Sequence, residues 1–289
     1  MRARLRRLTI TTTMVLAVVL LAGATYQGVA TALERRDFPP PGHRIDVGGH
    51  QLHINCTGEG RPVVILEAPA TGMSAAWGWV QPEVARHTRV CSYDRAGMGW
   101  SEAGDAAYDP RNGPAQLHAL LAGARLSAPY IMVGESLGAA FARMYVAQYP
   151  GEVTAAVLID DPTPGAGEQQ TDSRGMRAFV RLVRYSPWLA RAGVLRATRL
   201  LSSEAEGLPP PAGGAVRAFL NRPDHLTRAG RELARWDETL ALAAQAHVSD
   251  DLIVQLHTES AEPGTFLTSH AAAAATQAII QAIQHARAR

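Results

Sequence analysis

The stretch that decides the fold reads Tyr130-Ile131-Met132-Val133-Gly134-Glu135-Ser136-Leu137-Gly138. Four apolar residues of strand length lead into a G-x-S-x-G pattern, and a helix is expected from Leu137 to Tyr149. A sharp strand-to-helix turn of this kind holds the serine hydroxyl at the edge of the sheet, and the flanking glycines let the neighbouring backbone pass. The N-terminus of the following helix favours negative charge at that place. The pattern therefore predicts that Ser136 is a nucleophile.

Outward from this turn, short apolar runs alternate with helical segments. Eight strands are expected, at His43–Val47, His50–Cys56, Pro62–Glu67, Thr88–Tyr93, Tyr130–Val133, Val153–Ile159, Leu252–Leu256 and Thr265–Thr268. Helices are expected at Pro114–Leu126, Leu137–Tyr149 and Ala271–Arg289. The alternation predicts a mostly parallel sheet flanked by helices. Residues from about 162 to 247 have a purely helical pattern, which indicates a helical cap inserted into the domain that spans 43–289.

The N-terminal segment differs from the rest of the chain. Four arginines lie within residues 2–7, and no charged residue occurs from Leu8 to Leu33. This pattern is typical of an export signal, and its length nearly suffices to span a bilayer. Residues 1–33 are therefore expected to be a signal anchor or a signal peptide, with small residues at 22–24 and 30–32 as possible cleavage sites.

Residues 34–42 contain three consecutive prolines and are expected to be a stiff linker. Arginines on the N-terminal side indicate that the N-terminus stays in the cytoplasm and that the domain crosses the membrane. We expect the domain on the outer side of the cytoplasmic membrane, held through its N-terminal segment, or in the secreted or periplasmic space if the signal is cleaved.

Composition excludes several classes of protein. Apolar residues make up 47% of the chain and charged residues 19%, which is ordinary for a globular protein and excludes full disorder. The formal net charge is only +2 and the N-terminal arginines account for it, so nucleic acid is not an expected partner. The cysteines form no C-x-x-C pattern and no histidines cluster near them, so no metal site is expected.

Two further segments extend the pattern around Ser136 into a family resemblance. Residues 94–101, Asp94-Arg95-Ala96-Gly97-Met98-Gly99-Trp100-Ser101, resemble the D-x-x-G-x-G-x-S turn of the α/β-hydrolase family. The stretch Tyr149–Val153, followed by Val157–Asp160, resembles its Y-P-x-x-V…L-x-L-x-D segment. The resemblance covers about residues 38–162 and implies an α/β-hydrolase fold, with an eight-stranded sheet and a helical cap after the sixth strand.

The nucleophile narrows the chemistry that this resemblance implies. Epoxide hydrolases and haloalkane dehalogenases of this fold use an aspartate where this chain has Ser136. A serine implies acyl transfer to water through an acyl-enzyme, with a small carboxylic ester as the expected substrate and no cofactor. A catalytically weak or inactive binding protein of the same fold is one alternative, and an acyltransferase or peptidase that uses the same triad is another.

The family order of serine, acid and histidine guides the choice of the other triad members. His270 follows the last expected strand and is the expected base, with His257 as the alternative. The acid is expected after the penultimate strand, at Glu259 or Glu262, or at the end of the strand before the cap, at Asp160.

The oxyanion site departs from the family pattern. The N–H of Leu137, directly after the nucleophile, is one expected donor. The family has an H-G-x or A-G-x turn after its third strand, but this chain reads Glu67-Ala68-Pro69-Ala70, and proline has no N–H. The second donor is therefore lost at Pro69 or supplied by Ala70, and the loss of one donor typically costs roughly 10²–10³ in rate.

The resemblance also implies a disulfide. In the α/β-hydrolase sheet the second strand is antiparallel and lies beside the fourth. Cys56 falls near the end of the expected second strand and Cys91 near the start of the fourth, so the two are expected to meet. Two buried, unpaired cysteines that act as small hydrophobic residues are the alternative. Export would place the pair in an oxidising compartment.

Overall fold

One twisted sheet carries the domain, and its strands form where the sequence has short apolar runs rich in β-branched residues. The computed structural model describes residues 2–104, 107–164, 173–201, 205, 207–258 and 266–288. Within them the sheet has seven strands in the order β1-β2-β4-β3-β5-β6-β7. The strands are β1 His43–Asp46, β2 Gln51–Thr57, β3 Val63–Glu67, β4 Val90–Tyr93, β5 Tyr130–Glu135, β6 Val153–Ile159 and β7 Ile253–Leu256.

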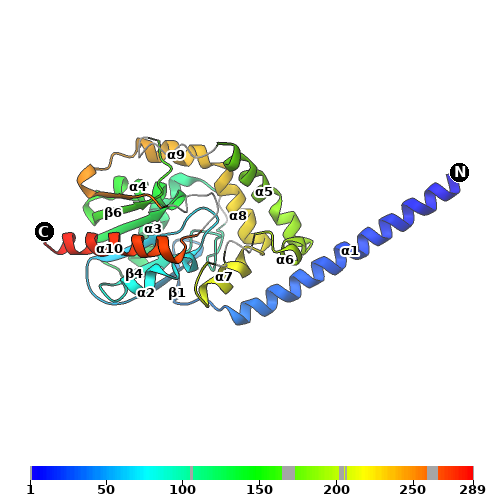
Figure 1. The fold of residues 1–289 in the computed structure, drawn as a ribbon, viewed down its shortest axis with the longest axis horizontal. Coiled ribbons are helices and arrows are strands. Elements are labelled where there is room, and N and C mark those ends of the chain that lie inside the picture. The colour runs from blue at the N-terminus through cyan, green and yellow to red at the C-terminus, as the bar shows by residue number, and fades with distance from the viewer. Residues whose placement is uncertain are drawn as a thin grey trace.

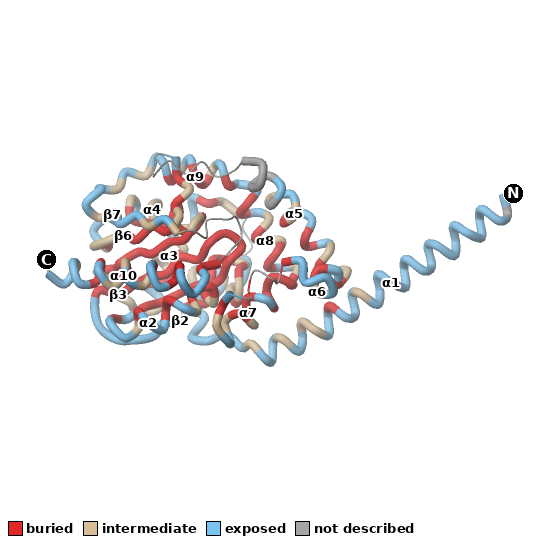
Figure 2. Tube along the Cα trace, in the orientation of Figure 1, coloured by how far each residue is buried: buried red, intermediate tan, exposed pale blue. Residues whose placement is uncertain are grey.

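The sheet is parallel except at one edge. β1 pairs antiparallel with β2, and β2 pairs antiparallel with β4. All other neighbours are parallel, so the carboxyl ends of β3, β5, β6 and β7 meet at one edge of the sheet. Every residue of β3 and β5 is buried, which agrees with strands covered on both faces (Figure 2).

Helices cover both faces of the sheet (Figure 1). Buried side chains of α3 (Gly113–Gly123) and α4 (Leu137–Gln148) form one hydrophobic cluster with the sheet, and those of α2 (Val80–Val84) and α10 (Ser269–Ala288) form another. Short 3₁₀ turns lie at Ser74–Trp77, Pro110–Asn112, Pro150–Glu152 and Asp250–Leu252. The sheet edge that bears Ser136 is therefore held between two apolar layers.

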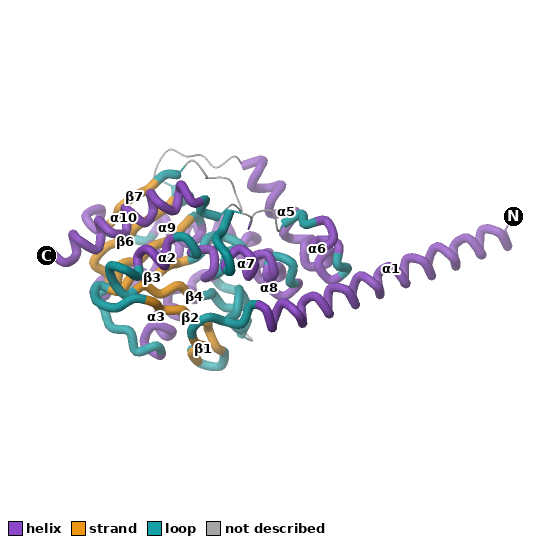
Figure 3. The backbone as a smooth tube through the Cα atoms, turned by 60° about the horizontal axis from the view of Figure 1, so that its bottom comes forward, coloured by secondary structure: helices purple, strands orange, loops and turns teal. Residues whose placement is uncertain are grey.

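Five α-helices lie between β6 and β7 in the described residues. They are α5 Ser173–Arg191, α6 Val194–Thr198, α7 Ala212–Phe219, α8 Pro223–Ala234 and α9 Trp236–Gln245. α8 packs against α5, and α9 packs against α4. Figure 3 shows α5–α8 gathered at the end of the molecule from which α1 extends. We call this set of helices the insertion.

The N-terminal segment is one helix, α1, from Arg2 to Asp37. Its residues 34–37 are helical, so the linker expected over 34–42 is wrong for its first four residues, and only the part after Asp37 is irregular. Among the described residues, one helix is long and apolar enough to cross a membrane by length and composition, over Arg4–Asp37. Its N-terminal part extends away from the domain with its side chains exposed (Figures 1 and 2).

The eighth strand is absent from the described part of the chain, which corrects the expected sheet. Residues 266–268 of the expected strand Thr265–Thr268 are irregular, and Thr265 lies outside the described residues. A parallel neighbour of β7 needs a crossover of roughly a dozen or more residues, and 257–264 is shorter than that. Phe266 and Leu267 are instead buried in side-chain clusters that involve the insertion and α10.

The two cysteines lie directly opposite each other. Cys56 of β2 is the register partner of Cys91 of β4, and the two side chains form a disulfide. The antiparallel register of β2 and β4 produces this meeting, and the bond ties the edge pair β1–β2 to the parallel part of the sheet.

Candidate active site

The expected nucleophile lies at a strained turn. Ser136 connects β5 directly to α4 with φ 52° and ψ −121°. A non-glycine residue with positive φ is uncommon, and such strain concentrates at functional sites. The Ser136 N–H donates to the Ile159 carbonyl at 2.9 Å, which fixes the turn against the end of β6. The residue is half-buried, so its side chain retains access to solvent.

The glycines around Ser136 are required by close backbone contacts. A Cβ atom on Gly138 would lie 2.4 Å from the Glu67 carbonyl oxygen and 2.6 Å from that of Ala68. A Cβ atom on Gly134 would lie 2.4 Å from the Gly138 carbonyl oxygen. The first turn of α4 therefore rests directly on the backbone at the end of β3.

That contact brings the expected oxyanion loop next to Ser136. The loop begins with Glu67 and Ala68, which touch Gly138, and continues through Pro69 and Ala70. The Pro69 carbonyl accepts a hydrogen bond from the Gly72 N–H at 3.1 Å, so this segment is a tight turn. On the helix side Leu137 is the first residue of α4, and the first N–H groups of a helix have no acceptor within it.

A buried arginine supports the loop from behind. The Arg95 guanidinium donates to the Ala68 carbonyl at 2.6 Å and to the Pro69 carbonyl at 3.0 Å. The same group forms ion pairs with Glu67 at 2.7 Å and with Glu232 of α8 at 2.9 Å. Arg95 thus joins the loop, the end of β3 and the insertion.

The charges of this group oppose the effect of burial. Burial lowers the pKa of Arg95, but Glu232 and Glu67 more than offset it and hold that pKa well above its ordinary value. Burial raises the pKa of Glu232, but Arg95 more than offsets it and brings that pKa below the ordinary value. Burial raises the pKa of Glu67 in spite of Arg95. Arg95 and Glu232 therefore remain charged.

A buried histidine of α8 holds the next residue of the loop. The His225 Nδ1 accepts from the Gly99 N–H at 3.1 Å, so its Nε2 carries the proton that is donated to the Thr71 carbonyl at 2.9 Å. Burial lowers the pKa of His225, which keeps the ring neutral. Thr71 itself has φ 60°. The insertion therefore supports the loop at two points, through Glu232 and through His225.

Of the expected acids, the structure describes Asp160. It directly follows β6, has φ 48°, and its carboxylate accepts from the Thr258 N–H at 2.7 Å and from the Thr258 hydroxyl at 2.5 Å. Because Ile159 is the register partner of Glu135, Asp160 lies at the same sheet edge as Ser136. Glu259 and Glu262 lie outside the described residues.

The expected bases are both exposed. His270 lies in the first turn of α10, rather than after a strand, and His257 follows β7. Within the described residues neither ring makes a hydrogen bond with Ser136 or Asp160. The structure therefore does not bring the expected base into contact with the expected nucleophile and acid. In the same part of the chain, no group of three or more His, Cys, Asp or Glu side chains could hold a metal ion.

One buried acid beside the nucleophile was not expected from sequence. Glu135 is the variable residue before Ser136, and burial together with the nearby Asp160 raises its pKa to about 8. Its place in the G-x-S-x-G pattern was visible, but its burial depends on tertiary packing. Arg95 likewise lies in the quoted segment 94–101, but the sequence alone assigned it no role.

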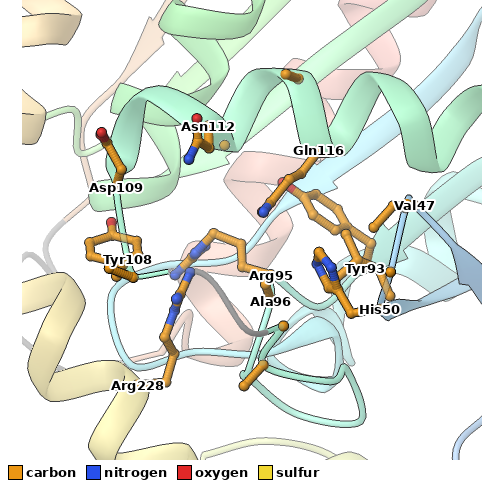
Figure 4. A pocket seen from close by; sticks show the side chains of 18 of the residues that line it. Val47, His50, Tyr93, Arg95, Ala96, Tyr108, Asp109, Asn112, Gln116 and Arg228 are labelled. Carbon is orange, nitrogen blue, oxygen red and sulfur yellow. The ribbon is translucent and has the colours of Figure 1, made fainter.

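The cavity in Figure 4 lies apart from Ser136. It has a volume of about 500 Å³, and its walls include His50, Tyr108 and Arg228 (Figure 4). Arg95 lines it and also binds the expected oxyanion loop, whereas Ser136 is not among its lining residues. Arg95 and Arg228 share Glu232 as an ion-pair partner, at 2.9 and 3.7 Å.

Fold and site together define the class of protein. A profile of the α/β-hydrolase fold matches residues 61–218, which is more than half of the chain and includes β3, the turn at Ser136 and β6. The chain belongs to the α/β-hydrolase fold family.

Individual relatives are more distant. An uncharacterised protein of Schizosaccharomyces pombe is 32% identical over 120 residues, covering 40% of this chain and 21% of that protein. The 2-hydroxy-6-oxo-2,4-heptadienoate hydrolase of Pseudomonas putida is 29% identical over 121 residues, covering 41% of this chain and 44% of the enzyme. A haloalkane dehalogenase structure from Agrobacterium tumefaciens matches with TM-score 0.60 at 18% identity, covering 82% of this chain and 84% of that one. The matched region spans less than half of each of the two sequence relatives, and the dehalogenase shares the fold.

The contact of Gly138 with the end of β3 can be tested by adding one methyl group. Gly138→Ala would press a Cβ atom against two carbonyl oxygens, and overpacking of this kind typically costs about 1–3 kcal/mol. Gly151→Ala is the matched control, because a Cβ atom there meets nothing within 4 Å. Urea unfolding should show a loss of stability for Gly138→Ala alone, and equal stability of the two variants would contradict the contact.

The raised pKa of Glu135 predicts a pH dependence of stability. Its ordinary pKa is 4.5 and its folded pKa is about 8, so between these values the folded state binds the extra proton. Stability therefore falls as pH rises through this window, by at most about 1.4 kcal/mol per pH unit. Glu135→Gln should lose less stability than wild type between pH 5 and pH 8, measured by urea unfolding. The exposed Glu59→Gln should behave as wild type, and a wild-type pH slope in Glu135→Gln would refute the assignment.

Proposed function

We propose that this chain is a serine hydrolase that cleaves carboxylic esters through an acyl-enzyme on Ser136. The observation that carries the proposal is the backbone of Ser136, which is held at positive φ at the carboxyl edge of the sheet, next to the first turn of α4. A serine presented in this way is suited to nucleophilic attack on an acyl carbon. The names of the similar proteins support hydrolysis in general, and the ester is inferred from the serine.

The reaction follows from the groups at this edge. The Ser136 oxygen attacks the ester carbonyl carbon while its proton passes to a histidine, for which we propose His270, with His257 as the alternative. The ester carbonyl oxygen becomes negative and accepts a hydrogen bond from the Leu137 N–H. The histidine then gives this proton to the alcohol, which leaves. The same histidine deprotonates a water molecule that attacks the acyl-enzyme, and it returns that proton to Ser136 as the acid is released.

Asp160 is the best-supported acid of the proposed triad. Its backbone position beside the end of β5 places its carboxylate at the edge that bears Ser136, and Thr258 orients that carboxylate. A carboxylate with two fixed hydrogen bonds retains lone pairs that can accept an imidazole N–H. Thr258 directly follows His257, so a loop that bears one of the two candidate bases already contacts this acid.

A protein of this fold with little or no hydrolase activity is the second candidate. The observation that favours it is Pro69, which has no N–H. It lies in the loop beside the turn at Ser136, where a hydrogen-bond donor to the oxyanion is expected. The loop is held by Arg95 at the carbonyls of Ala68 and Pro69, so its shape does not depend on such a donor.

We also propose that α1 spans the cytoplasmic membrane and holds the domain on its outer side. Its length and composition suffice for a span, and its four N-terminal arginines favour the cytoplasmic side for that end.

The nucleophile can be tested with an active-site probe. Purified full-length protein should be labelled by a fluorophosphonate on Ser136, and Ser136→Ala should abolish both labelling and the hydrolysis of small activated esters. Ser101 is another serine in the segments that resemble the family. The variant Ser101→Ala is the matched control and should retain labelling. Labelling that is undiminished in Ser136→Ala would exclude Ser136 as the nucleophile.

The role of Pro69 can be tested by restoring an N–H. Pro69→Gly and Pro69→Ala both supply one, so both should raise kcat for an activated ester, by up to about 10² if the donor reaches the oxyanion. The pair separates two causes, because glycine adds flexibility and alanine adds little. A rate gain in Pro69→Gly alone would indicate loop flexibility, and folded variants no faster than wild type would show that this position is not a donor site.

A further inference from the structure

The C-terminal half of α1 is packed against the insertion. A Cβ atom on Gly23 would lie 2.1 Å from the Ala192 carbonyl oxygen, so the two backbones are in direct contact. One turn further on, Gln27 is 5% exposed and donates to the Asn221 carbonyl at 2.7 Å. The helix face that includes Gly23 and Gln27 is therefore part of the folded domain.

An ion pair extends this contact toward the end of α1. The Arg196 guanidinium of α6 binds both carboxylate oxygens of Glu34, one of them at 3.0 Å, and its Nε donates to Gln27 at 3.1 Å. Beyond α1, the Phe38 carbonyl accepts from the Trp100 indole at 3.2 Å. Gly23, Gln27, Glu34 and Phe38 thus all contact the domain.

Length then places the insertion at the bilayer. The stretch from Leu8 to Ala22 covers about 22 Å as a helix at ~1.5 Å per residue. The hydrocarbon core of a bilayer is about 30 Å thick, so a spanning α1 needs residues up to about Gln27 inside it. Gly23 lies within that stretch and touches Ala192. The turn between α5 and α6 is thus brought to the outer boundary of the membrane.

The surface that reaches this boundary has the composition of a membrane interface. Trp188 is 71% exposed and Tyr185 62%, although both are large aromatic residues. The Arg191 guanidinium lies 5.3 Å from the centre of the Trp188 ring. Residues 173–201 contain seven arginines and no acidic residue. Aromatic side chains favour the bilayer interface, and basic clusters bind anionic lipid headgroups.

We propose that this surface rests in the headgroup layer of the membrane that α1 crosses, with anionic phospholipid as its partner. We call it the α5–α6 face, and it consists of Arg181, Arg184, Tyr185, Trp188, Arg191 and Val194. All six are exposed and lie on the elements that adjoin α1 (Figures 1 and 3). α1 is then a retained anchor and a structural part of the domain. The inference rests on the span proposed for α1 and is independent of Ser136.

Contact with lipid can be read from tryptophan fluorescence. Full-length protein is reconstituted into vesicles of phosphatidylcholine and phosphatidylglycerol, in which part of the phosphatidylcholine carries bromine on the acyl carbons nearest the headgroup. Bromine quenches tryptophans that it touches. Trp77, Trp100 and Trp236 are buried, so Trp188 should account for most of the quenching. Trp188→Phe should therefore lose most of it.

Trp79→Phe is the matched control. Trp79 is the second exposed tryptophan, is not part of the α5–α6 face, and donates its indole N–H to the Gly207 carbonyl at 2.7 Å. This variant should be quenched as strongly as wild type. A charge variant, Arg181→Gln with Arg184→Gln, should be quenched less than wild type, whereas Arg86→Gln with Arg89→Gln should not change.

Each other outcome overturns the proposal at a distinct step. Equal quenching of wild type and Trp188→Phe would place the α5–α6 face in water. Protection of Trp188 by a second copy, seen as a dimer by light scattering, would assign the face to self-association. Removal of the protein from vesicles by alkaline carbonate, or an intact mass that shows cleavage after residue 24 or 32 in the exported protein, would refute the retained anchor.

Discussion

The close contact between the first turn of α4 and the backbone at the end of β3 is the constraint on which the site depends. No side chain fits between Gly138 and the carbonyl groups of Glu67 and Ala68, so α4 must begin directly against the neighbouring strand. The chain can then turn from β5 into α4 only through one residue, and Ser136 takes the positive φ. The same contact sets the loop of Pro69 beside Ser136, so the serine and the loop are positioned by one packing contact.

Polar contacts from buried side chains hold the loop in its shape. Arg95 binds two of its carbonyl groups and His225 a third, and both side chains are buried. A buried guanidinium requires compensation, which Glu67 and Glu232 supply. The consequence is that the loop takes its conformation partly from α8, a helix far away in the sequence.

Sequence reasoning succeeded where the signal is local. Apolar runs located seven strands, and the spacing of glycines around Ser136 located the turn. It failed where the conformation or role of a residue depends on a partner far away in the sequence. Glu34 continues α1, where it pairs with Arg196, instead of starting a linker, and Arg95 pairs with Glu232, 137 residues further on. The eighth strand failed for a reason that was already visible, because too few residues follow β7 for a crossover. Local pattern also gave no indication that Glu135 would be buried.

The way in which charge is divided between the two parts of the molecule has a mechanical consequence. Arg95, which follows β4, pairs with Glu67 of β3 on the sheet side, and Arg228 pairs with Glu232 within α8 of the insertion. If the insertion moved outward, each of these four groups would keep one partner of opposite charge on its own side. Separation then costs hydrogen bonds, among them those of Arg95 and His225 across the boundary, and entering water can replace them. Parting this boundary would break the Arg95–Glu232 ion pair at 2.9 Å, but Arg95 would keep Glu67 and Glu232 would keep Arg228.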